Sequence, residues 1–331
     1  MKPTVDTLYV TPDIPTMTDN FNLDQLKQEL YKPLTQALDD QASVGEISLL
    51  CPLKPVMDDS AKLLVKDTAG HPIAVVLCSS PVTPGLVARG MERTRLVKQA
   101  LGSDIGRVVL DPLLEGKING LSYAVLPHCQ PLSSSRLIWP VQRTLLSPHV
   151  FQWLSRVTEV TANTVHAEQV EPDFIVPLKY LAELEAMTER VRAGAQQVLQ
   201  RLADGKWSPR HVVMHNDLWK GNILLEDRNV SGLGKQLSTE HFIIIDWMGA
   251  MVQGYAMYDL IRLAQSLKLG GRQLREHVTT HCQFLGCDFI DARSHLLAAL
   301  GYLGMHLEHF PLPRFVQMAD SCLEKIEQIQ G

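Results

Sequence analysis

A polar cluster separates two apolar segments in the stretch VVMHNDLWKGNILL, which runs from Val212 to Leu225. The cluster contains His215, Asp217 and Asn222. An Asp in a tight loop between two strands can accept a proton from a hydroxyl group or orient that hydroxyl as a nucleophile. The amide oxygen of Asn222 is a suitable ligand for a hard cation such as Mg²⁺. The alternative is that Asp217 and Asn222 only cap turns.

A second acidic residue follows the next apolar run. Asp246 ends the segment Phe242–Ile245, which has the length and composition of a buried strand. In chain order, the sequence therefore offers a base, an amide ligand and a carboxylate ligand, which are the parts of a phosphoryl-transfer site. That reaction needs them because the metal neutralises charge on the transferring phosphoryl group while the base positions the acceptor oxygen.

The spacing of these residues resembles a known family. The pattern H-x-D-x-x-x-x-N at 215–222, followed by I-D-W at 245–247, is similar to the catalytic and metal-binding loops of the aminoglycoside phosphotransferase/choline kinase family, relatives of the protein kinases. The family form is close to H-G-D-x-x-x-x-N, and Asn216 stands here in place of its Gly. The Asp-Leu-Trp stretch also resembles the fructosamine kinases of the same superfamily.

The resemblance implies an α+β, two-lobed protein-kinase-like fold and an enzyme that transfers the γ-phosphoryl group of ATP, with Mg²⁺, to a small molecule. It implies that Asp217 is the catalytic residue, that His215 braces its loop, and that Asn222 and Asp246 hold the metal. The Asp-Leu pair that begins at Asp259 matches a further family element. Asp259 is then expected at the start of a helix, where it supports the catalytic loop through hydrogen bonds to the backbone.

The same resemblance assigns residues to the nucleotide. It implies that 121–129 forms the strand and hinge that hold adenine, with backbone groups near Leu126 and His128 meeting the base edge. No G-x-G-x-x-G loop is present in the sequence. The turn at 55–60 takes its place, and Ser60 is expected to contact a phosphate.

The lysine that the family carries on the third strand of the small lobe is missing. The segment Pro72–Ser79 contains no Lys or Arg, and the expected position falls at 77–78. Lys62 and Lys66 lie one strand earlier, and either can reach the phosphates from there; we retain Lys66 as the candidate. Glu92 matches the Glu that pairs with this lysine in kinases. The alternative for all three charges is an exposed position on the surface.

Composition excludes several other classes of function. The chain has 331 residues, a net charge of −5, 45% hydrophobic and 20% charged residues, which is ordinary for a globular protein and argues against a non-specific nucleic-acid binder. No apolar run has the length of a membrane span, and the N-terminus lacks the apolar core of a signal peptide, so a cytoplasmic protein is expected. The six cysteines form no dense framework, and the spacing of Cys282 and Cys287 is not that of a zinc pair.

Residues 1–126 are expected to form the small nucleotide-binding lobe. The segment 1–21 reads as a loose polar arm, and 22–40 as an amphipathic helix because its leucines recur at helical spacing. A second helix is predicted at 86–101. Short segments rich in Val, Ile and Leu, separated by turn signals, predict an antiparallel sheet of about five strands: Glu46–Cys51, Lys62–Lys66, Ile73–Cys78, Arg107–Leu110 and Ser122–Leu126.

Residues 127–331 are expected to form a larger, mainly helical lobe that carries the catalytic and acceptor sites. A helical insert at about 172–210 contains a long predicted helix, Leu178–Leu202. The related small-molecule kinases carry such an insert, which favours a small acceptor over a protein. The segment 226–240 is polar and is expected to be a lengthened hairpin. Four further helices are predicted at about Met257–Leu267, Gln273–Phe284, Ile290–Leu307 and Pro313–Ile329.

The acceptor is the least defined part of the prediction. Trp219 has a side chain that can stack on a sugar ring, and the acids Glu308 and Asp288 can hold ammonium groups such as those of aminoglycosides. A sugar or amino sugar is ranked first, and a choline-like alcohol or a glycan acceptor is the alternative. A second class of function remains open: a kinase-like protein that binds nucleotide or serves as a scaffold without catalysis.

Overall fold

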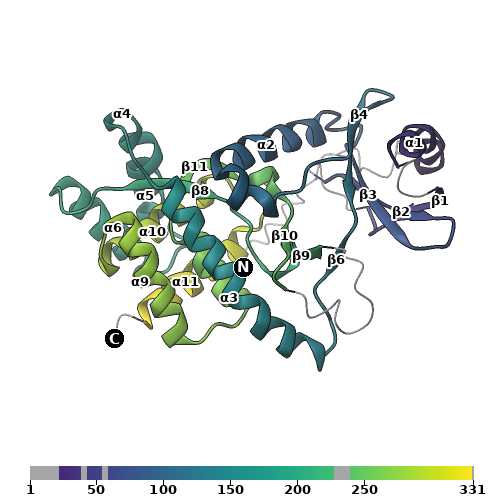
Figure 1. Cartoon of the computed structure of the whole chain (residues 1–331). Helices are drawn as coiled ribbons and strands as arrows, with labels where there is room; N and C mark the ends of the chain where they lie inside the picture. The colour runs from purple at the N-terminus through teal and green to yellow at the C-terminus, as the bar shows by residue number, and fades with distance from the viewer. Residues whose placement is uncertain (1–21, 39–42, 54–58, 227–238, 330–331) are drawn as a thin grey trace, which may run out of the picture. The chain divides into compact units, whose positions relative to one another are not determined.

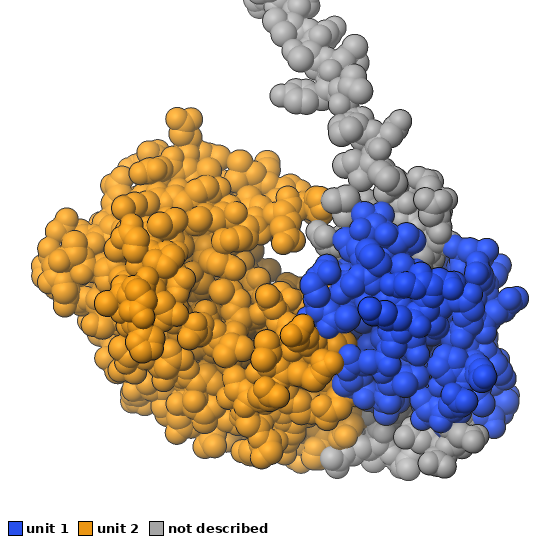
Figure 2. Space-filling model, turned by 90° about the horizontal axis from the view of Figure 1, so that it is seen from above, with its two compact units in different colours: residues 1–89, 112–127 blue, residues 90–111, 128–331 orange. Residues whose placement is uncertain are grey.

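The structure is a computed structural model that describes residues 22–38, 43–53, 59–226 and 239–329. Three predicted features lie wholly or mostly outside the described residues: the arm at 1–21, the turn at 55–60 and the hairpin segment 226–240. The chain divides into two compact units, which Figure 2 colours separately. The first comprises Met1–Arg89 and Pro112–Pro127, and the second comprises Gly90–Asp111 and His128–Gly331.

The first unit is built on a 5-stranded antiparallel sheet in the order β1-β2-β3-β5-β4, which confirms the predicted sheet (Figure 1). The strands are β1 (Val44–Leu49), β2 (Ala61–Asp67), β3 (Pro72–Cys78), β4 (Leu114–Ile118) and β5 (Leu121–Pro127). Helix α1 (Leu23–Leu38) buries a leucine on every fourth residue from Leu26 to Leu38, as its spacing predicts. These leucines pack with one face of the sheet to form the core of this unit.

One predicted strand is wrong. Arg107–Leu110 is not part of the sheet, because Gly106–Val108 forms a short 3-10 helix and both Val108 and Val109 are buried in the core of the second unit. The fifth strand is β4 instead. It is joined to β5 by Asn119 and Gly120, which both have positive φ, and Asn-Gly is the pair that a tight hairpin turn of this kind prefers.

Helix α2 (Leu86–Ile105) contributes to both units, because its residues from Gly90 onward group with the second. The regular helical backbone is interrupted at Gly102, where φ is 72°. Within the second unit the helix is tied down by the indole of Trp153, which donates a 3.0 Å hydrogen bond to the carbonyl of Ile105. The helix predicted at 86–101 is confirmed, and in the structure it continues to Ile105.

The second unit is mainly helical, as predicted. Its core contains the fully buried side chains of Phe151, Phe174 and Phe315. Within the described residues, no helix is both long and apolar enough to cross a membrane. The helices are α3 (Ile138–Thr161), α4 (Ala167–Val170), a π-helix (Glu171–Ile175), α5 (Val176–Glu183), α6 (Glu189–Ala203), α8 (Tyr258–Ser266), α9 (Gly271–Leu285), α10 (Phe289–Met305) and α11 (Leu312–Glu327).

The long helix predicted at Leu178–Leu202 is also wrong, because it is two helices, α5 and α6. The chain becomes extended at Leu184, with ψ of 102°, and again at Thr188, with ψ of 147°. The Thr188 hydroxyl donates a 2.8 Å hydrogen bond to Asp320 of α11. A contact with a residue far away in the sequence therefore accompanies the break between α5 and α6. The apolar residues keep a helical spacing through this break, so the sequence pattern does not reveal it.

Two small sheets bring the polar cluster into position. One has the order β10-β9-β6 and the other β11-β8-β7. Strands β8 and β9 precede and follow the cluster, and β10 leads directly to Asp246. The bounds are β6 (Cys129–Pro131), β7 (Asn163–Thr164), β8 (Arg210–Met214), β9 (Ile223–Glu226), β10 (Phe242–Ile244) and β11 (Met251–Tyr255).

Candidate active site

The buried carboxylate of Asp259 holds the loop that follows β8. Asp259, the second residue of α8, accepts hydrogen bonds from the backbone N–H groups of His215, at 2.6 Å, and Asn216, at 3.1 Å. Burial raises the pKa of Asp259 to about 7, although these two N–H groups lower it. Because both donors belong to the loop itself, Asp259 fixes the direction in which the next residue, Asp217, leaves the strand.

His215 ties the same loop to the strand β10. Its Nε2 lies 2.9 Å from the carbonyl oxygen of Ile245, and its Nδ1 accepts a 3.3 Å hydrogen bond from the N–H of Asp217. Its ring packs on the indole of Trp247, with 4.4 Å between centroids. Burial lowers the pKa of His215 to about 4, so the ring is neutral near pH 7 and serves as a brace, with Nε2–H as the donor.

Asp217 is an exposed residue, and its partly buried carboxylate lies beside Asn222. The Asn222 amide nitrogen donates to the backbone carbonyl of Asp217 at 2.8 Å and to its carboxylate at 3.0 Å. Burial raises the pKa of Asp217; the hydrogen bond from Asn222 lowers it and the charge of Asp246 raises it further. A carboxylate with a raised pKa, held in place by a neighbouring amide, has the properties of a general base.

Asp246 is exposed at the end of β10 and adopts a left-handed backbone conformation, with φ of 69° and ψ of 51°. Asx residues tolerate this region better than most, but it is still a sparsely populated one and is typical of functional loops. The Asp246 charge acts on both Asp217 and His215, so the two carboxylates are electrostatic neighbours.

The donor set fits a magnesium ion. The amide nitrogen of Asn222 is turned toward Asp217, so its amide oxygen is available to coordinate a metal ion. Asp246 offers a carboxylate as a second ligand. Mg²⁺ is usually held by one or two carboxylates together with substrate phosphates, so a cage of protein ligands is not required. The part of the chain that the structure describes contains no group of three or more His, Cys, Asp or Glu residues that could hold a metal ion.

The presence of Asn at position 216, where the family that the loop resembles carries Gly, has a structural explanation. Asn216 has φ of 75°, in the left-handed region that Gly enters freely and that Asn enters more readily than most other residues. Its Oδ1 is buried without a hydrogen-bond partner in the described structure. The backbone geometry of the loop therefore restricts this position to Gly, Asn or a similar residue.

We expect Asn216→Val to destabilise the protein by about 2 kcal/mol, because a β-branched residue is poorly tolerated at positive φ. Asn216→Gly, which relieves the same backbone constraint, is the matched control and should unfold within a few degrees of the unsubstituted protein. Thermal unfolding measures both. Equal melting temperatures for the Val and Gly variants would contradict the assignment of strain to this position.

Arg262 is a site residue that the sequence did not reveal. Its positive charge lowers the pKa of Asp217, and the side chain is half-buried on α8. It follows Asp259 by three residues, and residues three apart share one face of a helix. The spacing of Asp259 and Arg262 is a signal that the sequence does contain, because the helix face that carries Asp259 also faces the carboxylate of Asp217.

The predicted nucleotide contacts are divided between the units. In the first, the Ser60 hydroxyl is buried, Lys66 forms a 2.9 Å ion pair with Glu46, and Leu126 is half-buried at the end of β5. In the second, Glu92 is exposed on α2 and makes no ion pair within the described residues, and His128 is half-buried directly after β5.

Of the acceptor candidates, Trp219 is the one for which the described residues show a contact with Asp217. Its side chain hydrogen-bonds to the Asp217 carboxylate and its ring lies over Gly221, while 41% of the residue remains exposed. Asp288 is the N-cap of α10, where its carboxylate accepts a 2.8 Å hydrogen bond from the N–H of Asp291. Glu308 follows the other end of α10, and a helix of 17 residues is about 25 Å long, so these two acids cannot line one small pocket.

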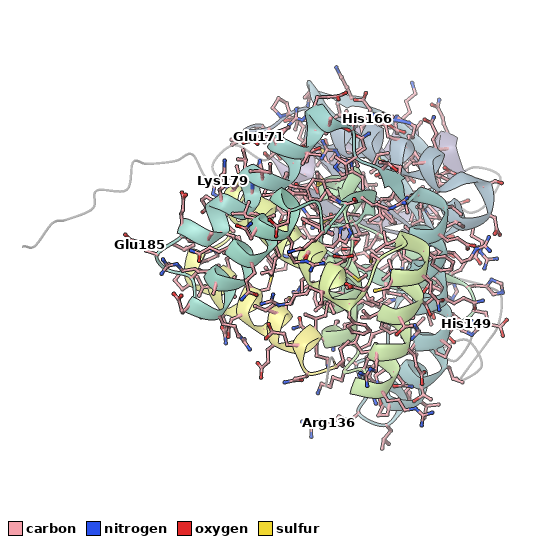
Figure 3. All side chains as sticks on the ribbon, turned by 90° about the vertical axis from the view of Figure 1, so that its left-hand side faces the viewer. Arg136, His149, His166, Glu171, Lys179 and Glu185 are labelled. Carbon is pink, nitrogen blue, oxygen red and sulfur yellow. The ribbon has the colours of Figure 1, made fainter. Side chains whose placement is uncertain are left out.

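The insert is anchored by an aromatic cluster that the sequence did not indicate. The Tyr255 hydroxyl donates a 2.6 Å hydrogen bond to the carbonyl of Asp173 in the π-helix, and the Asp173 carboxylate lies 3.1 Å from His211. Tyr255 also packs against Tyr302 of α10, at 5.2 Å. Charged residues of the insert such as Lys179 and Glu185 lie instead at the protein surface (Figure 3). The insert is thus fixed to β8, β11 and α10, strands and helix of the same unit.

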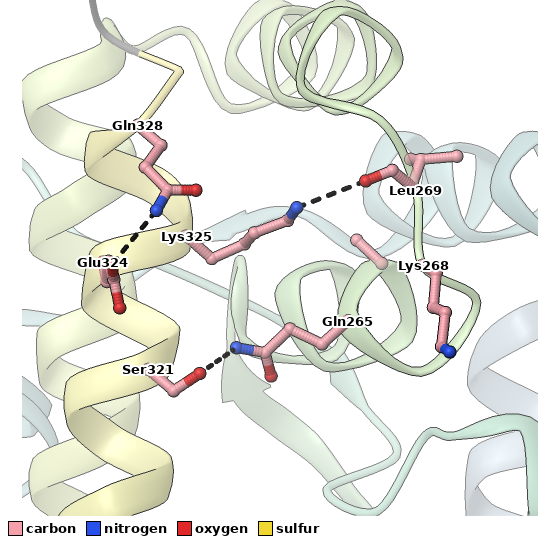
Figure 4. A pocket seen from close by; sticks show the side chains of 8 residues that line it. Gln265, Lys268, Leu269, Ser321, Glu324, Lys325 and Gln328 are labelled. Carbon is pink, nitrogen blue, oxygen red and sulfur yellow. Dashed lines mark hydrogen bonds between the residues drawn. The ribbon is translucent and has the colours of Figure 1, made fainter.

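A surface hollow of about 390 Å³ between α8 and α11 is separate from this site (Figure 4). Its polar groups bind one another, since Gln265 donates to Ser321 at 3.1 Å and Lys325 donates to the carbonyl of Leu269 at 3.2 Å. Neither Asp217 nor Asp246 lines it.

The fold of the chain is that of the kinase-like phosphotransferases. More particularly, it is similar to solved structures of a thermostable mutant of aminoglycoside phosphotransferase APH(4)-Ia. The apo form is 16% identical, with a TM-score of 0.53 over 91% of this chain and 99% of that chain. A ternary complex with ADP and hygromycin B is 15% identical, with a TM-score of 0.54 over 92% and 99%. No protein-family model and no curated protein matches the sequence.

Proposed function

We propose that the protein is a phosphotransferase that moves the γ-phosphoryl group of ATP to a hydroxyl group of a small molecule. The observation that carries this proposal is the arrangement of Asp217, which is exposed, held by Asn222 and influenced by the charge of Asp246. A base, an amide oxygen and a carboxylate in one place are what in-line phosphoryl transfer requires. The similar structures that contain ADP with hygromycin B, or AMP-PNP with hygromycin B, support the same reading.

In this mechanism Asp217 orients the acceptor hydroxyl and takes its proton as the oxygen attacks the phosphorus. The raised pKa of Asp217 makes it a stronger proton acceptor than an ordinary Asp. The hydrogen bond from Asn222 keeps the carboxylate in one orientation, while His215 and Asp259 keep the loop rigid. Positioning of this kind is a major part of catalysis in phosphoryl transfer.

Magnesium, when bound, neutralises charge on the phosphates of ATP. Asn222 and Asp246 are the residues that would hold it. The positive charge of Arg262 balances part of the negative charge of Asp217.

A sugar or amino sugar is the acceptor class that we favour. Trp219 presents an exposed aromatic surface next to Asp217, and sugar rings bind to such surfaces through their apolar faces. Hygromycin B, which is bound in two of the similar structures, is an aminoglycoside. A choline-like alcohol or a glycan is the alternative acceptor.

A phosphorylation screen tests the proposal. The protein is incubated with Mg-ATP and, separately, with sugars, aminoglycosides, nucleosides and amino alcohols, and the release of ADP is measured. We expect release that depends on the acceptor and is greatest among the sugars or amino sugars. A thermal shift with Mg-ATP but no turnover with any acceptor favours the non-catalytic nucleotide-binding alternative. The absence of both a shift and turnover refutes the proposal.

A further inference from the structure

The sheet of the first unit has one face that α1 does not cover. Side chains alternate along each strand, and Leu63, Val65, Val76 and Val125 point into the core beneath α1. The opposite face carries half-buried side chains that belong to neither hydrophobic core: Leu64, Val75, Leu77 and Leu126. An apolar sheet face of this kind suits a flat ring, and under the proposed function that ring is the nucleobase.

The register across the sheet defines positions along this face. Leu64 of β2 is opposite Val75 of β3, and Val75 is opposite Leu126 of β5. Leu64, Val75 and Leu126 thus form a row across the sheet, which we call the Val75 row. This row lies at the end of β5, where the backbone near Leu126 and His128 is expected to meet the base edge. In a purine nucleotide the ribose and phosphates are attached on the side of the ring away from that hydrogen-bonding edge. The phosphates must then extend along the sheet, away from Pro127.

Lys62 occupies the face in that direction. It is directly opposite Leu77, two residues or about 7 Å beyond the row of Leu64 and Val75, and it alternates onto the same face as Leu64. Leu77 stands where the third-strand lysine is missing. The Lys62 side chain is 33% exposed, and its amino group forms a 3.2 Å ion pair with Asp59. Ser60, the other expected phosphate contact, lies at the same end of β2.

Lys66 lies at the opposite end. It is paired with Pro72 of β3 and with Glu46 of β1, on the other side of the Val75 row from Lys62. Its amino group is bonded to the Glu46 carboxylate at 2.9 Å. A nucleotide whose base edge meets the end of β5 would direct its phosphates away from Lys66.

We propose that Lys62, on β2, binds the phosphates of the nucleotide and supplies the positive charge that β3 lacks. Asp59 holds its amino group when no nucleotide is present. This inference rests on the proposed function, because it takes the ligand to be a nucleoside triphosphate. It replaces Lys66, the candidate retained from the sequence, with a residue selected by strand register. A lysine is suited to this role since its ammonium group binds phosphate as a point charge.

Binding measurements on the full chain test the inference separately from catalysis. Isothermal titration calorimetry gives the Kd of Mg-ATP and of adenosine for the unsubstituted protein and for Lys62→Met. We expect Lys62→Met to weaken Mg-ATP binding by about 10- to 100-fold, the usual cost of losing a charge-assisted contact, and to leave adenosine binding unchanged. Retained adenosine binding also shows that the variant is folded. Lys117→Met, on the edge strand β4 of the same sheet, is the matched control and should bind both ligands normally.

A rescue variant makes the test specific for the register. Lys62→Met combined with Leu77→Lys moves the charge across to β3, and it should recover most of the lost Mg-ATP affinity. Lys62→Arg keeps the charge on β2 and should lose less affinity than Lys62→Met. Unchanged Mg-ATP binding in Lys62→Met, or a loss that appears in Lys66→Met instead, would overturn the inference. If the unsubstituted protein binds no Mg-ATP, the proposed function itself fails.

Discussion

Replacing Asp217 with Asn should reduce the turnover number for phosphoryl transfer by about a thousandfold, within the range expected for loss of a general base. The substitution keeps the size of the side chain and an oxygen that can still accept the hydrogen bond from Asn222. It removes the negative charge that takes the proton from the acceptor. Steady-state kinetics with an acceptor from the screen measures the loss, and calorimetry should give a Kd for Mg-ATP within about threefold of the original.

An acidic residue away from the site provides the control for this substitution. Asp104 is exposed on the part of α2 that belongs to the second unit, so Asp104→Asn should leave both turnover and nucleotide binding unchanged. Normal turnover in Asp217→Asn would show that Asp217 is not the base. An equal loss in both variants would attribute the effect to overall charge.

The pH dependence gives a second measure of the same residue. Burial raises the pKa of Asp217, so the carboxylate is protonated, and unable to act as a base, at a higher pH than an ordinary Asp. We therefore expect kcat/KM to fall as the pH falls through this raised pKa, and the residual activity of Asp217→Asn to lack that decrease. A profile that keeps the same acidic decrease in the variant would assign it to another group.

The candidate catalytic loop could be located from the sequence because its information is local. His215, Asp217 and Asn222 lie within eight residues, and the chemistry of each side chain indicates its role. The flanking apolar segments are short and rich in branched residues, so they predict the strands β8 and β9 that the structure contains. Loops that carry chemistry are usually placed in this way by the elements on either side.

Other features depend on contacts that a linear pattern does not contain. Alternation along β2 puts Lys62 and Lys66 on the same face, so the sequence offers no basis for choosing between them; the register with β3 does. Val108 and Val109 suggest a strand by composition, yet they are buried in the core of the second unit. The further partners that decide are distant along the chain, because β3 pairs with β5 through Val75 and Leu126, and Val109 is bridged to Ile244.

Replacing Asp246 should weaken the binding of the nucleotide itself, in contrast to the effect expected at Asp217. Asp246→Asn keeps the shape of the side chain and the tolerance for the left-handed backbone, at φ of 69°, but removes the negative charge offered to the metal. A metal site supplies several kcal/mol of charge stabilisation, and about 3 kcal/mol corresponds to a loss of more than a hundredfold. We therefore expect a loss of that size in the Mg-ATP affinity measured by calorimetry, and a larger one in kcat/KM.

Comparing Asp246→Asn with Asp246→Ala separates the charge from the backbone. Ala should show the same loss of Mg-ATP affinity and, in addition, a lower melting temperature, because it is less well tolerated than Asn at positive φ by about 1 kcal/mol. Titration with ATP and no divalent cation is the further control, since nucleotide binding that does not use the metal should be similar in all three proteins. If Asp246→Asn instead loses ATP binding equally with and without Mg²⁺, Asp246 acts on the fold of the loop and not on the metal.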